Sequence, residues 1–172
     1  VQTIRDLLDH KALVTIVTTD GAQQALSGMK SPPKLIITDS QVFDYVSSIT
    51  PKGTLLTSFS VLMARMKGDI DEFVQGAQAL DTLHADSRIL IAESCTHAPL
   101  EEDIGREKIP RMLRKKFGDS LQIDHVSGND FPADLSPYSL VIHCGGCMFN
   151  RKHILSRIAA CKDANVPITN YG

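Results

Sequence analysis

Short apolar segments rich in β-branched residues alternate along the chain with segments in which apolar residues recur at helical spacing. Strands that are apolar on both faces are typical of a parallel sheet covered by helices. The pattern therefore predicts an α/β protein with two small, mostly parallel sheets of βαβ units and helices on their faces. The predicted strands are residues 13–19, 34–38, 54–57, 88–92, 121–126, 140–143 and 166–169.

These elements fall into two groups, and the length of 172 residues suits one large domain or two small ones. We place the boundary near residues 84–87, which gives predicted domains 1–84 and 85–172. No stretch rich in glycine and serine marks the boundary, so we expect the two domains to pack closely.

The composition is that of a globular protein, with 42% hydrophobic and 22% charged residues and a formal net charge of −2. This balance gives no indication of a nucleic-acid or membrane surface, and no apolar run is long enough to cross a bilayer. The start at Val1 and the end just after a predicted strand lead us to expect a piece of a longer protein. The four cysteines, without a secretion signal, favour metal or redox use in a reducing compartment such as the cytoplasm.

The strongest chemical signal is His143-Cys144-Gly145-Gly146-Cys147, between a predicted strand and a predicted helix. Two cysteines separated by two residues can bring both thiolates to one metal centre. The glycines permit the tight turn and leave backbone N–H groups free to face sulfur. The positive potential at the start of the following helix favours thiolate over thiol.

A second group, Glu93-Ser94-Cys95-Thr96-His97, also follows a strand. In an extended chain Glu93, Cys95 and His97 point to the same side. Ligands of open α/β sheets bind at the carboxyl ends of the strands, so Cys95, Cys144 and Cys147 are predicted to converge there.

The fourth cysteine, Cys161, lies among apolar residues of a predicted helix and is expected to be buried and inert. One metal position would then be held by water or by another side chain. The spacing leaves an iron–sulfur cluster and a zinc site as alternatives, with zinc held by the three cysteines and a histidine. A dithiol redox pair is a third interpretation. No phosphate-binding glycine loop occurs, so we predict no nucleotide site and no catalysis by this chain.

The combination of Cys95-x-His97 with His143-Cys144-x-x-Cys147 resembles the cluster-binding signature of the HydF family, the FeFe-hydrogenase maturation GTPases. The resemblance extends over essentially the whole chain. It includes residues 37–41, 90–97, 102–106, 126–132 and 167–172.

This resemblance implies a parent protein with an N-terminal GTPase domain, absent here, followed by a dimerisation domain (1–84) and an iron–sulfur cluster-binding domain (85–172). It implies a 4Fe–4S cluster held by Cys95, Cys144 and Cys147. The fourth iron would be exchangeable, with Glu93, His97 and His143 as candidate ligands. The implied role is a homodimeric scaffold and carrier of the diiron precursor of the hydrogenase active site. The implied partners are two radical-SAM maturation enzymes and the FeFe-hydrogenase apoprotein.

Overall fold

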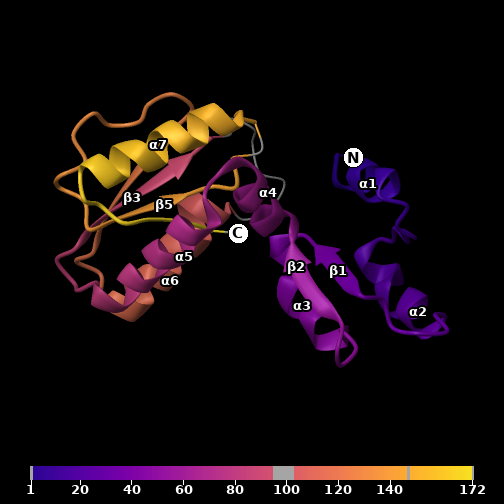
Figure 1. The fold of residues 1–172 in the computed structure, drawn as a ribbon. Coiled ribbons are helices and arrows are strands. Elements are labelled where there is room, and N and C mark those ends of the chain that lie inside the picture. The colour runs from indigo at the N-terminus through magenta and orange to yellow at the C-terminus, as the bar shows by residue number, and fades with distance from the viewer. Residues whose placement is uncertain (1, 95–102, 147, 172) are drawn as a thin grey trace. The chain divides into compact units, whose positions relative to one another are not determined.

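The computed structural model describes residues 2–94, 103–146 and 148–171. The chain divides into two compact units, Val1–Thr57 (unit 1) and Ser58–Gly172 (unit 2). Each unit combines short parallel strands with helices (Figure 1), which confirms the predicted α/β class.

Unit 1 is built on a two-stranded sheet of β1 (Leu35–Thr38) and β2 (Leu55–Ser58). Helix α3 (Phe43–Ile49) connects the strands, as a parallel pair requires. It follows the short 3-10 helix η2 (Ser40–Val42), where the Asp39 carboxylate accepts the Gln41 N–H as a cap. The elements before β1 are α1 (Gln2–Asp9), the 3-10 helix η1 (Thr19–Gly21) and α2 (Ala22–Ser27).

The strand predicted over residues 13–19 is wrong. Residues 12–18 have no regular secondary structure, and η1 begins at Thr19. Leu13 and Ile16 are 101% and 68% exposed. Apolar and β-branched composition favours a strand, but a strand forms only beside a neighbour that completes its hydrogen bonds. In the part of unit 1 that the structure describes, this segment has no such neighbour.

Unit 2 contains a four-stranded sheet in which all neighbours are parallel, in the order β4-β3-β5-β6. Ala92 of the central strand β3 stands opposite Val126 on one side and His143 on the other. The carboxyl ends of the strands therefore lie along one edge. The bounds are β3 (Arg88–Glu93), β4 (Gln122–Ser127), β5 (Leu140–His143) and β6 (Ile168–Asn170).

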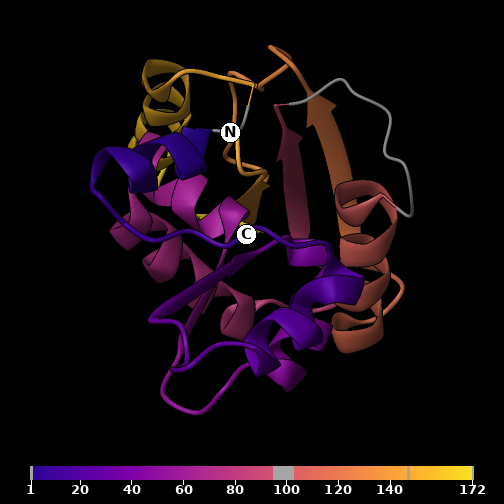
Figure 2. The same cartoon turned by 90° about the vertical axis from the view of Figure 1, so that its right-hand side faces the viewer.

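Helices cover both faces of this sheet (Figure 2). Alternate residues of β3 point to opposite faces. Leu90 and Ala92 pack beneath α4 (Phe59–Lys67) and α7 (Arg151–Asp163). Ile89 and Ile91 pack beneath α6 (Ile109–Phe117). All four of these β3 residues are fully buried, so β3 forms the centre of the core.

Helix α5 (Ile70–Gln78) runs against the edge strand β6 and continues into the 3-10 helix η3 (Ala79–Thr82). The Thr169 hydroxyl donates to the Phe73 carbonyl at 2.9 Å. A Cβ on Gly76 would lie 1.9 Å from the Ile168 carbonyl oxygen, so this approach requires glycine. Helices α4 and α5 thus belong to unit 2, and the units meet at residues 57 and 58. The functional division at residues 84 and 85 stays a prediction.

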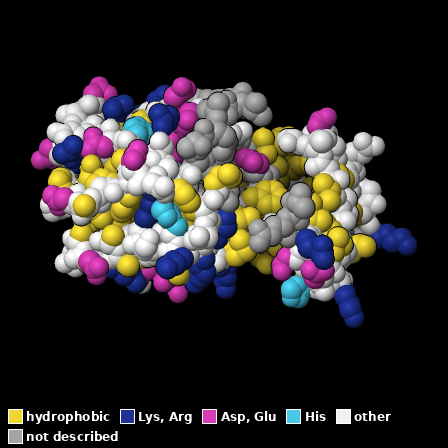
Figure 3. Space-filling view, turned by 90° about the horizontal axis from the view of Figure 1, so that it is seen from above, with side chains coloured by type: hydrophobic (Ala, Val, Ile, Leu, Met, Phe, Trp, Pro, Cys, Tyr) yellow, Lys and Arg dark blue, Asp and Glu magenta, His cyan; other side chains and the backbone are white. Residues whose placement is uncertain are grey.

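Charges of both signs are interspersed over the surface seen in Figure 3. No helix in the described ranges has both the length and the apolarity that crossing a bilayer requires.

Candidate functional site

The candidate site lies at the carboxyl ends of β3 and β5, which are adjacent in the sheet. The Cys144 N–H donates to the Ala92 carbonyl at 3.0 Å and extends the pairing by one step beyond β5. Glu93, Ser94, His143 and Cys144 are all buried there. The parallel topology therefore brings the beginnings of both predicted sequence groups side by side.

The Cys144 sulfur is the centre of the described part of the site. It accepts two backbone N–H groups, from Ser94 at 3.0 Å and from Gly146 at 3.4 Å. Hydrogen bonds to sulfur stabilise the thiolate and tune the metal centre that a thiolate binds. The side chain forms no disulfide and is 8% exposed.

Gly146 shapes the turn that follows Cys144. Its φ of 64° lies in the left-handed region, and an added Cβ would lie 2.7 Å from Ile154 Cδ1. The Lys67 ammonium donates to the Gly146 carbonyl at 3.1 Å. Asn150 then caps α7 by accepting the His153 N–H. Gly146 thus has the backbone conformation that favours glycine, while the turn predicted over residues 144–147 stays a prediction because Cys147 lies outside the described residues.

Cys95, His97 and Cys147 lie outside the described residues. Their convergence with Cys144 and their role as ligands stay predictions. The described residues nevertheless include the two that directly precede the other cysteines, Ser94 and Gly146, and both donate to the Cys144 sulfur. No group of three or more possible ligands for a metal ion occurs in the ranges 2–94, 103–146 and 148–171.

Glu93 forms an ion pair with Arg106 at 3.1 Å. Arg106 belongs to the π-helical segment η4 (Ile104–Lys108), which leads into α6 and is capped by Asp103. A Cβ on Gly105 would lie 2.5 Å from Glu93 Oε1 and 3.1 Å from the Tyr171 hydroxyl. Only glycine at position 105 lets η4 approach this carboxylate so closely. Glu93 is therefore held by a cation, and binding iron would require it to leave Arg106.

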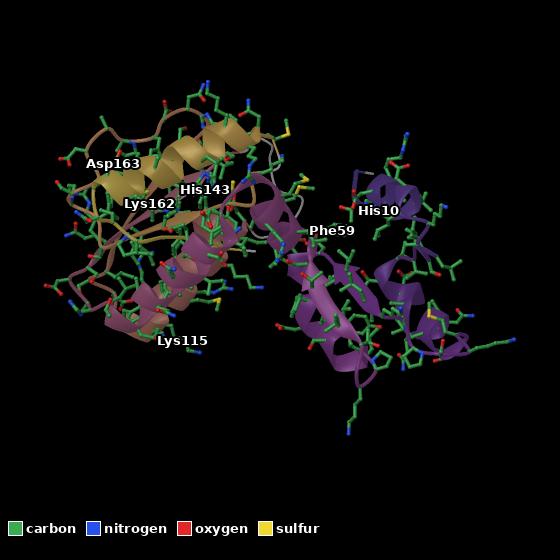
Figure 4. All side chains as sticks on the ribbon, viewed as in Figure 1. His10, Phe59, Lys115, His143, Lys162 and Asp163 are labelled. Carbon is green, nitrogen blue, oxygen red and sulfur yellow. The ribbon has the colours of Figure 1, made fainter. Side chains whose placement is uncertain are left out.

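His143 has both ring nitrogens occupied (Figure 4 shows it beside α7). Nε2 lies 2.9 Å from an Arg157 nitrogen, and Nδ1 lies 2.7 Å from the Cys144 carbonyl oxygen. Arginine only donates, so Nε2 accepts and Nδ1 carries the proton. Burial, together with the Arg157 charge, lowers the pKa of His143 to about 4. The imidazole is thus neutral at pH 7 and supports the Cys144 backbone.

Arg157 is the residue of this site that the sequence reasoning missed. Its side chain is 3% exposed, although it is charged. The signal was its spacing, because Ile154, Arg157, Ile158 and Cys161 share one face of α7 and all are buried. Cys161 is buried as predicted, and burial raises the pKa of its thiol to about 12.

The site also contains buried polar atoms that no described residue satisfies. They are Ser94 Oγ at the end of β3, Asn170 Nδ2 at the end of β6, and Arg157 Nε. Buried polar atoms normally have partners. Together with the sulfur and its two N–H donors, they make the edge suitable for an anionic, sulfur-rich group.

A separate groove of about 600 Å³ runs along η4 and α6. Four cationic side chains line it, one of which is Arg106, the partner of Glu93. The others are Arg111, Arg114 and Lys115, and Glu107 and Asp119 supply negative charge.

Two family models match the chain. The Hydrogen maturase F dimerization domain matches residues 1–68, and the Hydrogen maturase F tetramerization domain matches residues 71–172. No curated protein matches the chain. Both matched domains are named for self-association, and they meet between residues 68 and 71.

Proposed function

Because the chain belongs to the hydrogen maturase F family, which acts in hydrogenase maturation, we propose that it binds a 4Fe–4S cluster through Cys95, Cys144 and Cys147. The observation that supports this most directly is the position of the Cys144 sulfur. It accepts N–H groups from Ser94 and Gly146, the residues directly before the other two cysteines. Two separate stretches of chain thereby supply donors to one sulfur atom.

When bound, such a cluster supplies one iron whose fourth ligand can exchange. The chain offers Glu93, His97 and His143 for that position. Glu93 would have to leave Arg106, and His143 would have to give up Arg157 or the Cys144 carbonyl. A carboxylate binds a soft metal centre more weakly than a thiolate. Glu93 therefore suits a ligand that leaves when cargo arrives, with Arg106 ready to receive the released carboxylate.

On this proposal the chain is a scaffold and carrier. It would receive the diiron precursor from radical-SAM enzymes and deliver it to the FeFe-hydrogenase apoprotein, in the cytoplasm. The chain itself would catalyse nothing, and GTP hydrolysis would belong to a separate domain of a longer protein. The cationic groove along α6 is a reasonable entrance for an anionic complex, since Arg106 lies in it and contacts Glu93.

Self-association would cover the apolar side chains that unit 1 leaves exposed. The segment 13–19 has strand-like composition, no partner strand in the described chain and exposed Leu13, Ile16 and Val17. We propose that a second copy covers this segment in the homodimer. Removing apolar area from water is favourable by about 25 cal/mol per Å², and part of this gain offsets the entropy lost on association.

The test is anaerobic reconstitution with iron and sulfide, followed by metal and sulfide analysis and EPR of the reduced protein. We expect the cluster signal in the wild type and its loss in Cys95→Ala, Cys144→Ala and Cys147→Ala. Cys161→Ala is the matched control and should retain the cluster, because that thiol is buried in the α7 core. Zinc without sulfide, or a Cys144–Cys147 disulfide without metal, would replace this proposal with a zinc module or a dithiol oxidoreductase.

A further inference from the structure

Arg157 is a buried cation for which the described residues provide no acidic partner. Its side chain is 3% exposed, and no described carboxylate forms an ion pair with it. Buried arginines are normally paired, because removing a charge from water costs several kcal/mol. A buried guanidinium whose described partners are all neutral keeps its full charge and can balance a negative group nearby.

The groups around Arg157 hold it in place without neutralising it. It donates to His143 Nε2 at 2.9 Å and to the Gly128 carbonyl oxygen. The rings of Phe131 and Phe149 lie 4.8 Å and 5.5 Å from its central carbon. All of these partners are neutral, and the Nε atom has no hydrogen-bond partner among the described residues.

These contacts lead directly to the candidate site. Gly128 follows β4, His143 ends β5, and Arg157 itself lies on α7. His143 in turn donates from Nδ1 to the Cys144 carbonyl, so a fixed imidazole ring also restrains the Cys144 backbone. The guanidinium thus fixes the Cys144 backbone through His143, and its positive charge lies near Cys144.

We infer that Arg157 is a positioning residue that fixes the Cys144 turn through His143 and balances the negative charge of the thiolates and the cluster. The inference rests on the proposed function. A fixed positive charge favours the more negative, reduced state of a cluster. Removing the charge should therefore lower the reduction potential, whereas a purely structural residue would leave the potential unchanged.

The experiment compares variants that separate charge from geometry. Arg157→Gln removes the charge and leaves one amide nitrogen in place of the two guanidinium nitrogens that donate to His143 Nε2 and the Gly128 carbonyl. Arg157→Lys also has a single nitrogen in place of the two-pronged guanidinium but keeps the charge, so the two variants differ chiefly in charge. Lys152→Gln removes the same charge from an exposed position on the same helix and is the matched control. Each reconstituted protein is titrated with dithionite under EPR, and the metal-free protein is studied by hydrogen exchange over residues 140–150.

In Arg157→Gln we expect the equilibrium constant for one-electron reduction of the cluster to fall about tenfold. This corresponds to a reduction potential lower by about 59 mV. Arg157→Lys should keep a potential close to that of the wild type while speeding exchange over residues 140–150. Lys152→Gln should change neither quantity. If Arg157→Gln does not fold, the reduction potential of Arg157→Lys tests the inference instead. A potential lower than that of the wild type by about 59 mV in Arg157→Lys would overturn the inference.

An unchanged potential in folded Arg157→Gln would also overturn the inference while leaving the proposed function intact. Failure of the wild type to bind iron and sulfide would instead contradict the proposed function itself.

Discussion

The two units differ in how far they can build a core from their own residues. In unit 2, the central strand β3 is buried on both faces, and helices supply a packed layer on each side. In unit 1, Val46 is the one buried apolar side chain among the described residues, whereas Leu13, Ile16 and Leu55 are largely exposed. A single chain therefore builds a packed core in unit 2 but little core in unit 1, which agrees with the match of residues 1–68 to a dimerization domain. On our proposal unit 1 depends on a second copy, whereas the sheet of unit 2 holds the strand ends where the candidate site lies.

The largest effect should come from emptying the core of unit 2. Leu90→Ala removes a fully buried side chain from β3 beneath α7. We expect a loss of about 3 kcal/mol in the free energy of unfolding, because the cavity cannot collapse between packed layers. Urea denaturation followed by circular dichroism measures it.

The matched variant in unit 1 is Leu55→Ala, on a strand residue that is 69% exposed. It should change the free energy of unfolding by less than about 0.5 kcal/mol at protein concentrations where the chain is monomeric. If Leu90→Ala and Leu55→Ala lowered the free energy of unfolding equally, the two units would not differ in how well they bury their own apolar residues.

The next effect is a pH dependence that arises in unit 2. The pKa of His143 is about 4 in the folded chain because burial disfavours the charged ring, against an ordinary value of 6.5. The unfolded chain therefore binds more protons between these pH values. The stabilisation is complete above pH 6.5 and is lost as the pH falls toward 4. For the metal-free protein we expect this residue to reduce the free energy of unfolding by about 2 kcal/mol between pH 7 and pH 5.

His143→Gln should remove that part of the slope, since glutamine does not titrate but can still accept from Arg157. His10→Gln, at an exposed histidine that follows α1 in unit 1, is the control for the substitution itself (Figure 4). Parallel pH profiles for the wild type and His143→Gln would show that the ring is not held neutral.

A smaller effect should appear in the association of unit 1. Ile16→Asp places a charge in the exposed segment that we propose a second copy covers. Burying an unpaired carboxylate is unfavourable, so the dimer dissociation constant should rise at least about tenfold, or about 1.4 kcal/mol. Analytical ultracentrifugation measures it, with Gln24→Asp on an exposed position of α2 as control. An unchanged dissociation constant would place the interface elsewhere.

The same contrast explains what the sequence could predict. Strand β3 was predictable because its residues are apolar on both faces, which only a covered parallel strand accommodates. The structure of segment 13–19 was not predictable in this way. Its composition favours a strand, but the described chain contains no neighbouring strand with which it could pair. At the site, the turn around Gly146 followed from local chemistry. The Glu93–Arg106 pair and the burial of Arg157 did not, because they depend on which helix packs over which strand end.

The smallest predicted effect concerns the polar contacts at the start of the unit 2 sheet. Arg88 on β3 lies 2.7 Å from the Asp124 carboxylate on β4, and the Tyr138 hydroxyl donates to the same oxygen. Both charged side chains are more than a third exposed, so water competes for the pair and salt screens it. Arg88→Met should lower the free energy of unfolding by only about 0.5 to 1 kcal/mol, and by less at 1 M salt. Arg114→Met, at an exposed position of α6, is the matched control. A loss as large as that of Leu90→Ala would mean that unit 2 is stabilised by its charge network more than by its apolar layers, and that its contrast with unit 1 has a different physical cause.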